Sequence, residues 1–398
     1  MGQAFIVRRG SSGATINFNN TSLVSWLTIP PTSAGVKNGA SVSTSTKAVN
    51  AGGENSSGLS GSVFGIDKNL TKTSFENLTS LKKNHVGLEM NGLAAFAGGR
   101  NNGTDFMTVD GFNPKTGEKV ALTGIYYARG NMAAASNGKD SAFFGGDTRE
   151  GGVFRTVDWY THDYTHTHFD LDYPVSNAAA GSIAGKIFLA GGWYSKGPTY
   201  YNYVRIFNPD GTMSTGTNLS VPRKNLICVT IGDRRILFVG GEDANGILRN
   251  EIDVYGSDGS RNTVKYLQKG ITGMVGMSFE DCAILLCGRT ISGVSSKAYI
   301  IDDNLTITEI DLGTVRTNAT AAKVGDYGLL FDGCSNAALS SFVNSIQALH
   351  VPKAITIPPG ATYKLGTMTT EATATTFTTC PLTTPKLTGY IKISNITV

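Results

Sequence analysis

Short apolar runs that end in a pair of glycines, or in a degenerate form of that pair, recur along the chain. The clear copies are KAVNAGG, LAAFAGG, SAFFGGD, IFLAGGW and ILFVGGE, and two weaker copies, ILLCGR and LLFDGC, follow. The last glycine of each copy falls at residue 53, 99, 146, 192, 241, 288 or 333, so neighbouring copies are 45 to 49 residues apart. This regular spacing predicts seven repeated supersecondary units that stack on one another.

The pattern around each glycine pair predicts four β-strands per repeat. An alternating strand that runs into a turn rich in Asn, Asp, Pro and Gly comes after the pair, as in Thr108–Gly117, and a further strand follows, as in Lys119–Ile125. The innermost strand precedes the pair, as in His85–Met90. No segment has a sustained period of 3.6 residues, so we expect almost no helix.

These repeats resemble the kelch family of β-propellers. The resemblance rests on the glycine pairs and on an aromatic residue in the third strand, namely Phe112, Tyr160, Phe207 and Tyr255. It covers about residues 40–358 and implies a seven-bladed kelch-like β-propeller of four-stranded antiparallel blades. The tryptophan that comes later in a kelch repeat is missing from nearly every repeat of this chain. WD40 propellers are the alternative family, but no repeat here has the Trp-Asp pair that ends a WD40 strand. We expect glycine at the pairs because the inner strands crowd the central channel.

The two ends of the chain differ from the repeats, and we divide the chain into residues 1–40, 41–358 and 359–398. The N-terminal segment could add a strand to the propeller or form an attachment module. Our hypothesis is that it attaches the protein to a larger particle, so that deletion of residues 1–35 would leave a soluble, folded propeller. The C-terminal segment is a Thr-rich β extension that either completes a blade or forms a separate contact. The apolar stretch at residues 5–7 is too short for a secretory signal peptide.

Composition excludes several classes of function. Only 16% of the residues are charged and the net charge of +4 is not gathered into basic blocks, which argues against a nucleic-acid partner. No apolar run is long enough to insert into a membrane. The five cysteines have no CxxC spacing, so we expect buried reduced thiols and neither a disulfide framework nor a cofactor or metal site.

An Arg/Lys-x-Asn pattern recurs where the chain enters the innermost strand. Its asparagines are Asn84, Asn131, Asn177, Asn225 and Asn318, and its basic residues are Lys82, Arg129, Arg223 and Arg316. Residues in register at the mouth of the channel could form a ring that binds an anionic or sugar ligand. The alternative interpretation, which we favour, is that they hold the loop backbones between blades in place.

The loops that follow the glycine pairs are expected to open on the same face as this pattern. Repeat four has an aromatic-rich loop, WYSKGPTYYNY, and exposed aromatic rings indicate a binding site unless the loop packs its own aromatics. The candidate ligand-binding residues are Arg100, Arg149, Trp193, Tyr194, Tyr200, Tyr201, Glu242, Arg289, Arg129, Arg223 and Arg316.

A histidine cluster is a weaker candidate. His166 and His168 alternate along a strand and therefore share a face, which Asp170 continues. Two histidines on one face could ligate a metal, but we favour the interpretation that they belong to a polar outer strand facing water.

Function is interpreted from context, because the sequence contains no recognisable catalytic motif and we do not expect an enzyme. The opening MGQAFIVRRG resembles the start of tail-fibre-type proteins of phages and tailocins of Gram-positive bacteria, clostridia included. That resemblance implies a receptor-binding protein on a virion or tailocin tail, which is assembled in the host cytoplasm. Its expected partners are baseplate proteins and a bacterial surface glycan or protein. The sequence leaves open whether the protein is a homo-oligomer. The alternatives are an intracellular kelch adaptor and a carbohydrate-active enzyme such as an epimerase, a mutarotase or a glycan hydrolase.

Overall fold

The computed structural model describes residues 35–351 continuously and six strands outside that range. Those strands are β1 (Phe5–Gly10), β2 (Gly13–Phe18), β3 (Trp26–Ile29), β35 (Ile355–Ile357), β36 (Met368–Thr369) and β37 (Ala374–Thr375). The chain divides into two compact units, Leu27–Ala348 and a second unit built from both chain ends. Every regular element described is a strand, and the described residues include no helix that could span a membrane.

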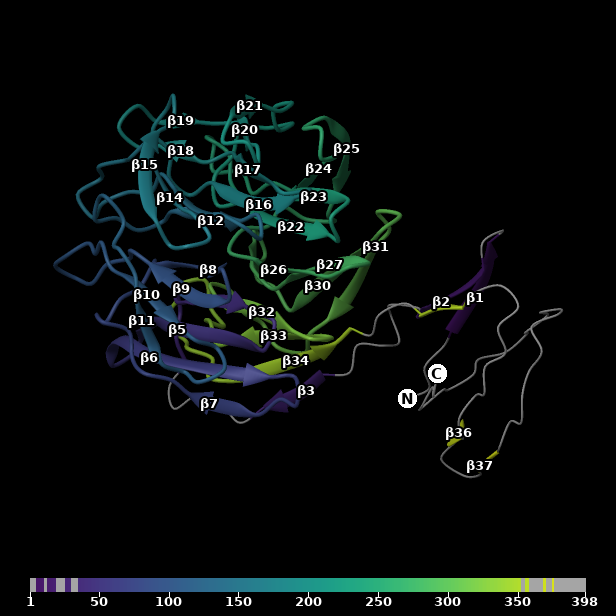
Figure 1. The fold of residues 1–398 in the computed structure, drawn as a ribbon. Coiled ribbons are helices and arrows are strands. Elements are labelled where there is room, and N and C mark those ends of the chain that lie inside the picture. Colours follow the sequence, from purple (N-terminus) through teal and green to yellow (C-terminus); the bar gives the residue numbers. More distant parts are fainter. Residues whose placement is uncertain are drawn as a thin grey trace. The chain divides into compact units, whose positions relative to one another are not determined.

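The larger unit is a seven-bladed β-propeller of mostly four-stranded antiparallel sheets (Figure 1). Blade one consists of β4 (Ala40–Ser43), β5 (Lys47–Asn55), β6 (Gly58–Asp67) and β7 (Lys72–Ser74). Blade two consists of β8 (Val86–Met90), β9 (Leu93–Ala97), β10 (Val109–Phe112) and β11 (Lys119–Ala121). Blade three consists of β12 (Ala133–Ser136), β13 (Ser141–Phe144), β14 (Thr156–Tyr160) and β15 (His166–Asp170).

Blades four to six repeat this order. Blade four consists of β16 (Ala179–Ile183), β17 (Lys186–Ala190), β20 (Val204–Phe207) and β21 (Met213–Thr215). Blade five consists of β22 (Ile227–Ile231), β23 (Arg235–Val239), β24 (Glu251–Tyr255) and β25 (Arg261–Tyr266). Blade six consists of β26 (Val275–Ser278), β27 (Cys282–Leu286), β30 (Lys297–Asp302) and β31 (Ile307–Asp311). Two short ribbons, β18 (Trp193–Tyr194) with β19 (Thr199–Tyr200) and β28 (Arg289–Thr290) with β29 (Gly293–Val294), follow the glycine-pair positions of blades four and six.

Blade seven is assembled from distant parts of the chain. Its strands are β32 (Thr320–Val324), β33 (Tyr327–Phe331), β34 (Ile346–His350) and, at the outer edge, β3, so residues near the N-terminus complete the last blade (Figure 1). Deletion of residues 1–35 would therefore remove an outer strand of the propeller. That the shortened chain still folds stays a prediction, and the propeller it tests lacks β3.

The apolar core is divided among the interfaces between neighbouring blades. The second strand of each blade is almost entirely buried, as in β9, whereas outer strands such as β11 are partly exposed. Each apolar cluster takes side chains from two adjoining blades. At the closing interface, Phe64 of blade one lies against Phe331 of blade seven with 5.8 Å between ring centroids. Blade stacking, as expected from the repeats, buries the sheet faces.

Each glycine pair adopts a backbone conformation with positive φ. In all seven blades both residues of the pair have positive φ, and the degenerate copies place Cys287 (φ 52°) and Asp332 (φ 49°) at the first position. A Cβ on Gly145 would lie 2.0 Å from the carbonyl oxygen of Val175, in the segment that leads to the next blade. We expected glycine at these positions because the inner strands crowd the channel. The structure shows a different reason, which is a left-handed turn packed against the segment that leads to the next blade.

The second unit contains a three-stranded sheet in the order β1-β2-β35. The opening FIVRRG motif is its first strand, which pairs with β2 from Phe5 opposite Phe18 to Gly10 opposite Gly13. The third strand, β35, comes from the other end of the chain. The β36–β37 hairpin lies in the Thr-rich C-terminal segment, and residues 376–398 lie outside the described part.

Candidate binding face at the channel mouth

Seven short bridges, one per blade, gather the residues that follow the glycine pairs on one face. Each bridge joins such a residue to the residue before the recurring asparagine position. The pairs are Lys37 with Glu54, Lys83 with Arg100, Gly130 with Asp147, Ser176 with Trp193, Lys224 with Glu242, Thr272 with Arg289, and Thr317 with Cys334. The structure thus places the loops and the asparagine pattern side by side.

The asparagines form a closed ring of left-handed residues, which we name the asparagine ring. Its members are Asn38, Asn84, Asn131, Asn177, Asn225, Gly273 and Asn318, with φ between 51° and 64°. The backbone N–H of Asn84 donates to the carbonyl of Asn38 at 2.9 Å, and comparable links of 2.9 to 3.4 Å join most neighbours around the ring. This supports the interpretation that these residues hold loop backbones in place.

Two members of the ring were missed in the sequence. Asn38 falls inside the segment that was assigned to the N-terminal extension, and Gly273 replaces asparagine in blade six. Both lie one repeat length from their neighbours, and glycine and asparagine share a tolerance for left-handed backbone. The spacing combined with that shared tolerance is the signal that could have identified them.

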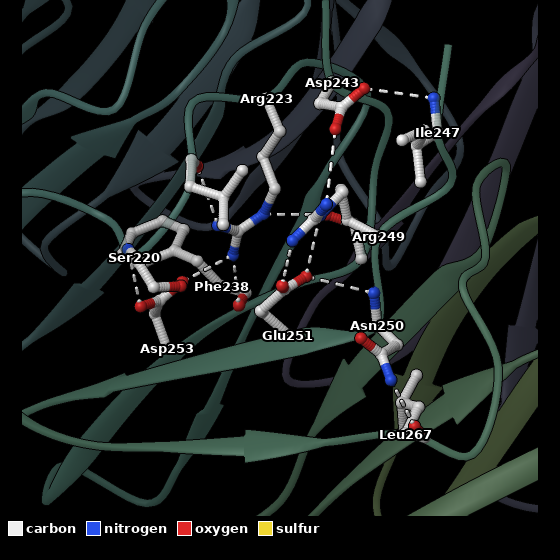
Figure 2. Close-up of polar contacts among 12 residues, drawn as sticks. Ser220, Arg223, Phe238, Asp243, Ile247, Arg249, Asn250, Glu251, Asp253 and Leu267 are labelled. Atoms are coloured by element: carbon white, nitrogen blue, oxygen red, sulfur yellow. Dashed lines mark hydrogen bonds and ion pairs between the residues drawn. The ribbon is translucent and has the colours of Figure 1, made fainter. Parts of the chain in front are cut away.

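The basic residues of the pattern are buried inside the blades. Lys82, Arg129, Arg223 and Arg316 have no exposed surface. Figure 2 shows the guanidinium of Arg223 directed at Asp253 of β24, with 2.7 Å between Nη2 and Oδ2. Arg223 also donates from Nε to the carbonyl of Gly240 at 2.8 Å. Arg129, Arg223 and Arg316, which were candidate ligand-binding residues, are therefore corrected to internal ties between loop and blade.

A second ion-pair network in Figure 2 holds the loop after the glycine pair of blade five. Asp243 accepts the backbone N–H of Ile247 at 3.0 Å and pairs with Arg249 at 3.2 Å. Arg249 also pairs closely with Glu251, and hydrogen bonding to Glu251 raises the pKa of the Arg249 guanidinium. These charges satisfy one another, so this loop is fixed and Arg249 has little capacity left for a ligand.

The asparagine ring borders a cavity of about 630 Å³, which we name the channel mouth. Blades three to seven contribute to its lining, with Asn225, Glu242 and Arg289 among the lining residues. Within residues 35–351 the side chains of Arg289 and Asn225 make no hydrogen bond or ion pair. The channel mouth therefore presents an uncommitted guanidinium, an exposed amide and a carboxylate.

The aromatic loop of blade four mostly packs on itself. Tyr201 is buried, with its ring centroid 4.6 Å from that of Tyr173, and Trp193 faces Tyr200 across the β18–β19 ribbon at 5.9 Å. The Nζ of Lys224 lies 3.8 Å above the Trp193 ring. Trp193, Tyr194 and Tyr200 are half-buried, so this loop does not project from the face. Lys224, whose Nζ is also 4.0 Å from Glu242, connects Trp193 to that carboxylate.

Arg100 and Arg149 have different environments. Arg100 is 12% exposed and is held by Asp147 at 2.6 Å and by Asp105 at 3.1 Å, which joins blades two and three. The side chain of Arg149 is 48% exposed, and its nearest acidic partner, Glu150, is 4.0 Å away. Of the predicted site residues, Arg289 and Glu242 therefore line the channel mouth, whereas Arg100 is structural and Arg149 lies in the surrounding loops.

The histidine cluster is engaged by other side chains. His166 Nε2 lies 2.8 Å from Asp158 Oδ1, and the His168 ring stacks on Tyr126 with 3.6 Å between centroids. Among the described residues no group of three or more His, Cys, Asp or Glu side chains could hold a metal ion.

The cysteines are free where the structure describes them. Cys228, Cys282, Cys287 and Cys334 form no disulfide, and Cys380 lies outside the described residues. Burial raises the pKa of the Cys287 thiol to about 12, so this thiol is protonated at neutral pH.

Comparison with known proteins does not assign this chain to a family. No model of a protein family matches it, and no curated protein matches it. What the structure establishes is the fold, a seven-bladed β-propeller.

Proposed function

We propose that this chain is a kelch-type receptor-binding protein of a phage or phage-tail-like particle. In this proposal the propeller recognises a glycan or protein of the bacterial host surface, and the unit built from both chain ends attaches it to other tail or baseplate proteins. The tail-fibre-like opening, the sparse charge and the division into two units support this assignment. The protein would be assembled in the host cytoplasm and released by lysis.

The observation that carries the proposal is the uncommitted polar chemistry of the channel mouth. The side chains of Arg289 and Asn225 make no hydrogen bond or ion pair within residues 35–351, and they share the cavity with the Glu242 carboxylate. A guanidinium fork binds anionic groups and pairs of oxygen acceptors, and an amide and a carboxylate bind hydroxyl groups. Anionic polysaccharides of a bacterial envelope offer these groups together.

The test compares binding of the purified full chain to intact Gram-positive cells and to their solubilised wall polysaccharide. Arg289→Ala should weaken binding at least tenfold. The control is Arg234→Ala, because Arg234 is a similarly surface-located arginine in the turn between β22 and β23, outside the channel-mouth lining. Equal binding by both variants, or no binding of the parent chain to any envelope, would contradict the proposal.

The attachment half of the proposal needs a separate measurement. Gold-labelled antibody against the chain should mark the tail ends of particles from the producing strain in electron micrographs. Labelling of the host cytoplasm alone, with unlabelled particles, would favour the intracellular adaptor.

A further inference from the structure

A second cavity, of about 740 Å³, lies at the outer side of blade three. Two segments that contact each other form most of its lining. One contains Tyr126 and Tyr127, in the connection from β11 to β12, and the other is formed by Phe154–Thr156 and the end of β15. It shares no lining residue with the channel mouth. We name this cavity the rim groove.

The wall of the rim groove is aromatic. Tyr126 and Tyr127 are neighbours in the chain and are 45% and 44% exposed. Tyr126 stacks on His168 with an interplanar angle of 16°, and Tyr127 stacks on Phe154 with 5.0 Å between centroids and an angle of 21°. The two tyrosines meet edge to face at 4.5 Å. One face of each tyrosine is thus supported from behind.

The wall is also fixed in position by the interior of the blade. The backbone N–H of Tyr126 donates to Asp158 Oδ1 at 2.7 Å, and Arg129 Nη1 donates to the carbonyl of Tyr127 at 2.9 Å. Asp158 and Arg129 form a buried ion pair with each other. Because the backbone under both rings is tied to this pair, a ligand would meet a preformed surface and would not have to order it.

The lining of the rim groove also contains a polar group of residues with no net charge. Arg155 Nε pairs with Asp170 Oδ2 at 2.9 Å, and Thr156 Oγ1 donates to Asp170 Oδ1 at 3.1 Å. Arg155 and Asp170 remain 58% and 45% exposed, so both retain capacity for further hydrogen bonds. Hydrogen-bond donors and acceptors therefore share the rim groove with the aromatic wall.

We propose that the rim groove binds an uncharged pyranose residue of a glycan. A pyranose has an apolar C–H face, which stacks on an aromatic ring, and a rim of hydroxyl groups, which a guanidinium and a carboxylate can engage together. The Arg155–Asp170 pair has no net charge, so the rim groove offers no excess charge that would select a charged ligand. The proposal is independent of the function proposed above, because it uses none of the channel-mouth residues.

A proline-rich peptide is the competing ligand, because such peptides dock into aromatic-lined grooves. The Arg155–Asp170 pair favours the sugar, since it matches vicinal hydroxyl groups, whereas a polyproline helix has few groups to donate to the carboxylate. The test below includes this ligand.

The experiment measures binding of the full chain by titration calorimetry and saturation-transfer NMR. The probes are cellohexaose, maltohexaose, chitohexaose and a decaproline peptide. We expect at least one hexasaccharide to bind, and Tyr127→Ala to weaken that binding at least tenfold. The matched control is Tyr266→Ala, which removes a 61% exposed tyrosine from the outer strand of blade five and should leave binding unchanged.

A second variant separates ligand binding from damage to the fold. Arg155→Ala changes only an exposed side chain and should weaken the same hexasaccharide while the melting temperature stays that of the parent. Arg289→Ala should bind the hexasaccharide as the parent does, which distinguishes this site from the channel mouth. Absence of binding by all three hexasaccharides, an unaffected Tyr127→Ala variant, or binding of decaproline that Tyr127→Ala abolishes would each overturn the proposal.

Discussion

Left-handed backbone is concentrated at three positions in each blade. In blade four, for example, Gly191, Gly192 and Asn177 have φ of 67°, 93° and 54°. Side chains other than glycine and asparagine cost about 1 kcal/mol in this region, which explains the residue types that recur there. Cys287 and Asp332 are exceptions that the surrounding blade imposes on the backbone.

His85 is the residue whose burial has the clearest consequence for stability. It is 5% exposed, its Nε2 lies 3.1 Å from the carbonyl oxygen of Ala51, and its ring meets Phe96 edge-on at 6.0 Å. Burial, together with the charge of Lys82, lowers the pKa of His85 to about 3. The unfolded chain takes up this proton near pH 6.5, so the contribution of neutral His85 is complete above that pH and is lost toward pH 3.

We therefore expect the free energy of unfolding to fall by about 2 kcal/mol between pH 6.5 and pH 5 because of this one group. Urea denaturation at a series of pH values, followed by tryptophan fluorescence, measures the slope. The same series on His85→Gln should lack this component, whatever the variant's absolute stability. Identical slopes for the two proteins would show that His85 is accessible to protons in the folded state.

At the scale of the element, one type of tie joins the loop before the inner strand to the third strand of the same blade in five of the seven blades. Lys82, Arg129 and Arg223 reach Asp110, Asp158 and Asp253, which occupy equivalent places in β10, β14 and β24. Blade four reverses the charges, since Arg205 of β20 pairs with Asp172 in the loop at 2.6 Å. In blade seven Arg316 bonds to Gln347 at 3.0 Å. The tie is retained while its chemistry changes.

Removal of one partner from such a tie should be costly. Arg223→Met removes the nearest cation from the buried Asp253, which keeps Arg261 at 3.4 Å, and we expect a loss of about 3–5 kcal/mol in the free energy of unfolding. Arg234→Met removes an exposed arginine that pairs with Asp303 at 3.1 Å, and we expect a loss below about 1 kcal/mol. Guanidinium chloride titrations of both variants provide the comparison. Similar losses would mean that the buried pair is no more important than a surface pair.

At the scale of the whole molecule, the ring is closed by strands from both ends of the described propeller. β3 forms the outer edge of blade seven, and Ile29 is buried in the cluster shared by blades seven and one. Without β3 the edge of β34 would be exposed and its backbone groups would lose their partners. Closure therefore links the N-terminal part of the chain to the stability of the propeller.

Two shortened chains test this closure. Residues 25–351 retain β3, whereas residues 31–351 lack it, and the two chains differ by six residues. We expect the shorter chain to melt at least several degrees lower and to aggregate more readily, because it loses an outer strand and exposes an edge. Scanning calorimetry and light scattering measure both effects. Coincident melting curves would show that β3 is dispensable for the fold.

The candidate site was only partly predictable. The sequence placed Glu242 and Arg289 on the face of the asparagine pattern, because both follow a glycine pair in a regular repeat. It offered Arg223 as a ligand-binding residue, because position in a repeat does not indicate whether a side chain points outward or into a blade. Of the rim groove the sequence offered only His168 and Asp170, as a weak metal candidate. Its aromatic wall was not predicted, since Tyr126, in the connection from β11 to β12, meets His168 of β15 only in the folded blade.

The sequence by itself determined the number of blades, the order of their strands and the face on which the loops gather. It did so because a propeller repeats one backbone path, and the left-handed turns of that path require glycine or asparagine at fixed intervals. Only the tertiary structure decided where the ring closes, because β3 has no turn signature and pairs with β34 more than 300 residues away. It likewise decided which charges are buried and which stay free, since that depends on partners such as Asp253 that stand far along the chain from the groups they neutralise.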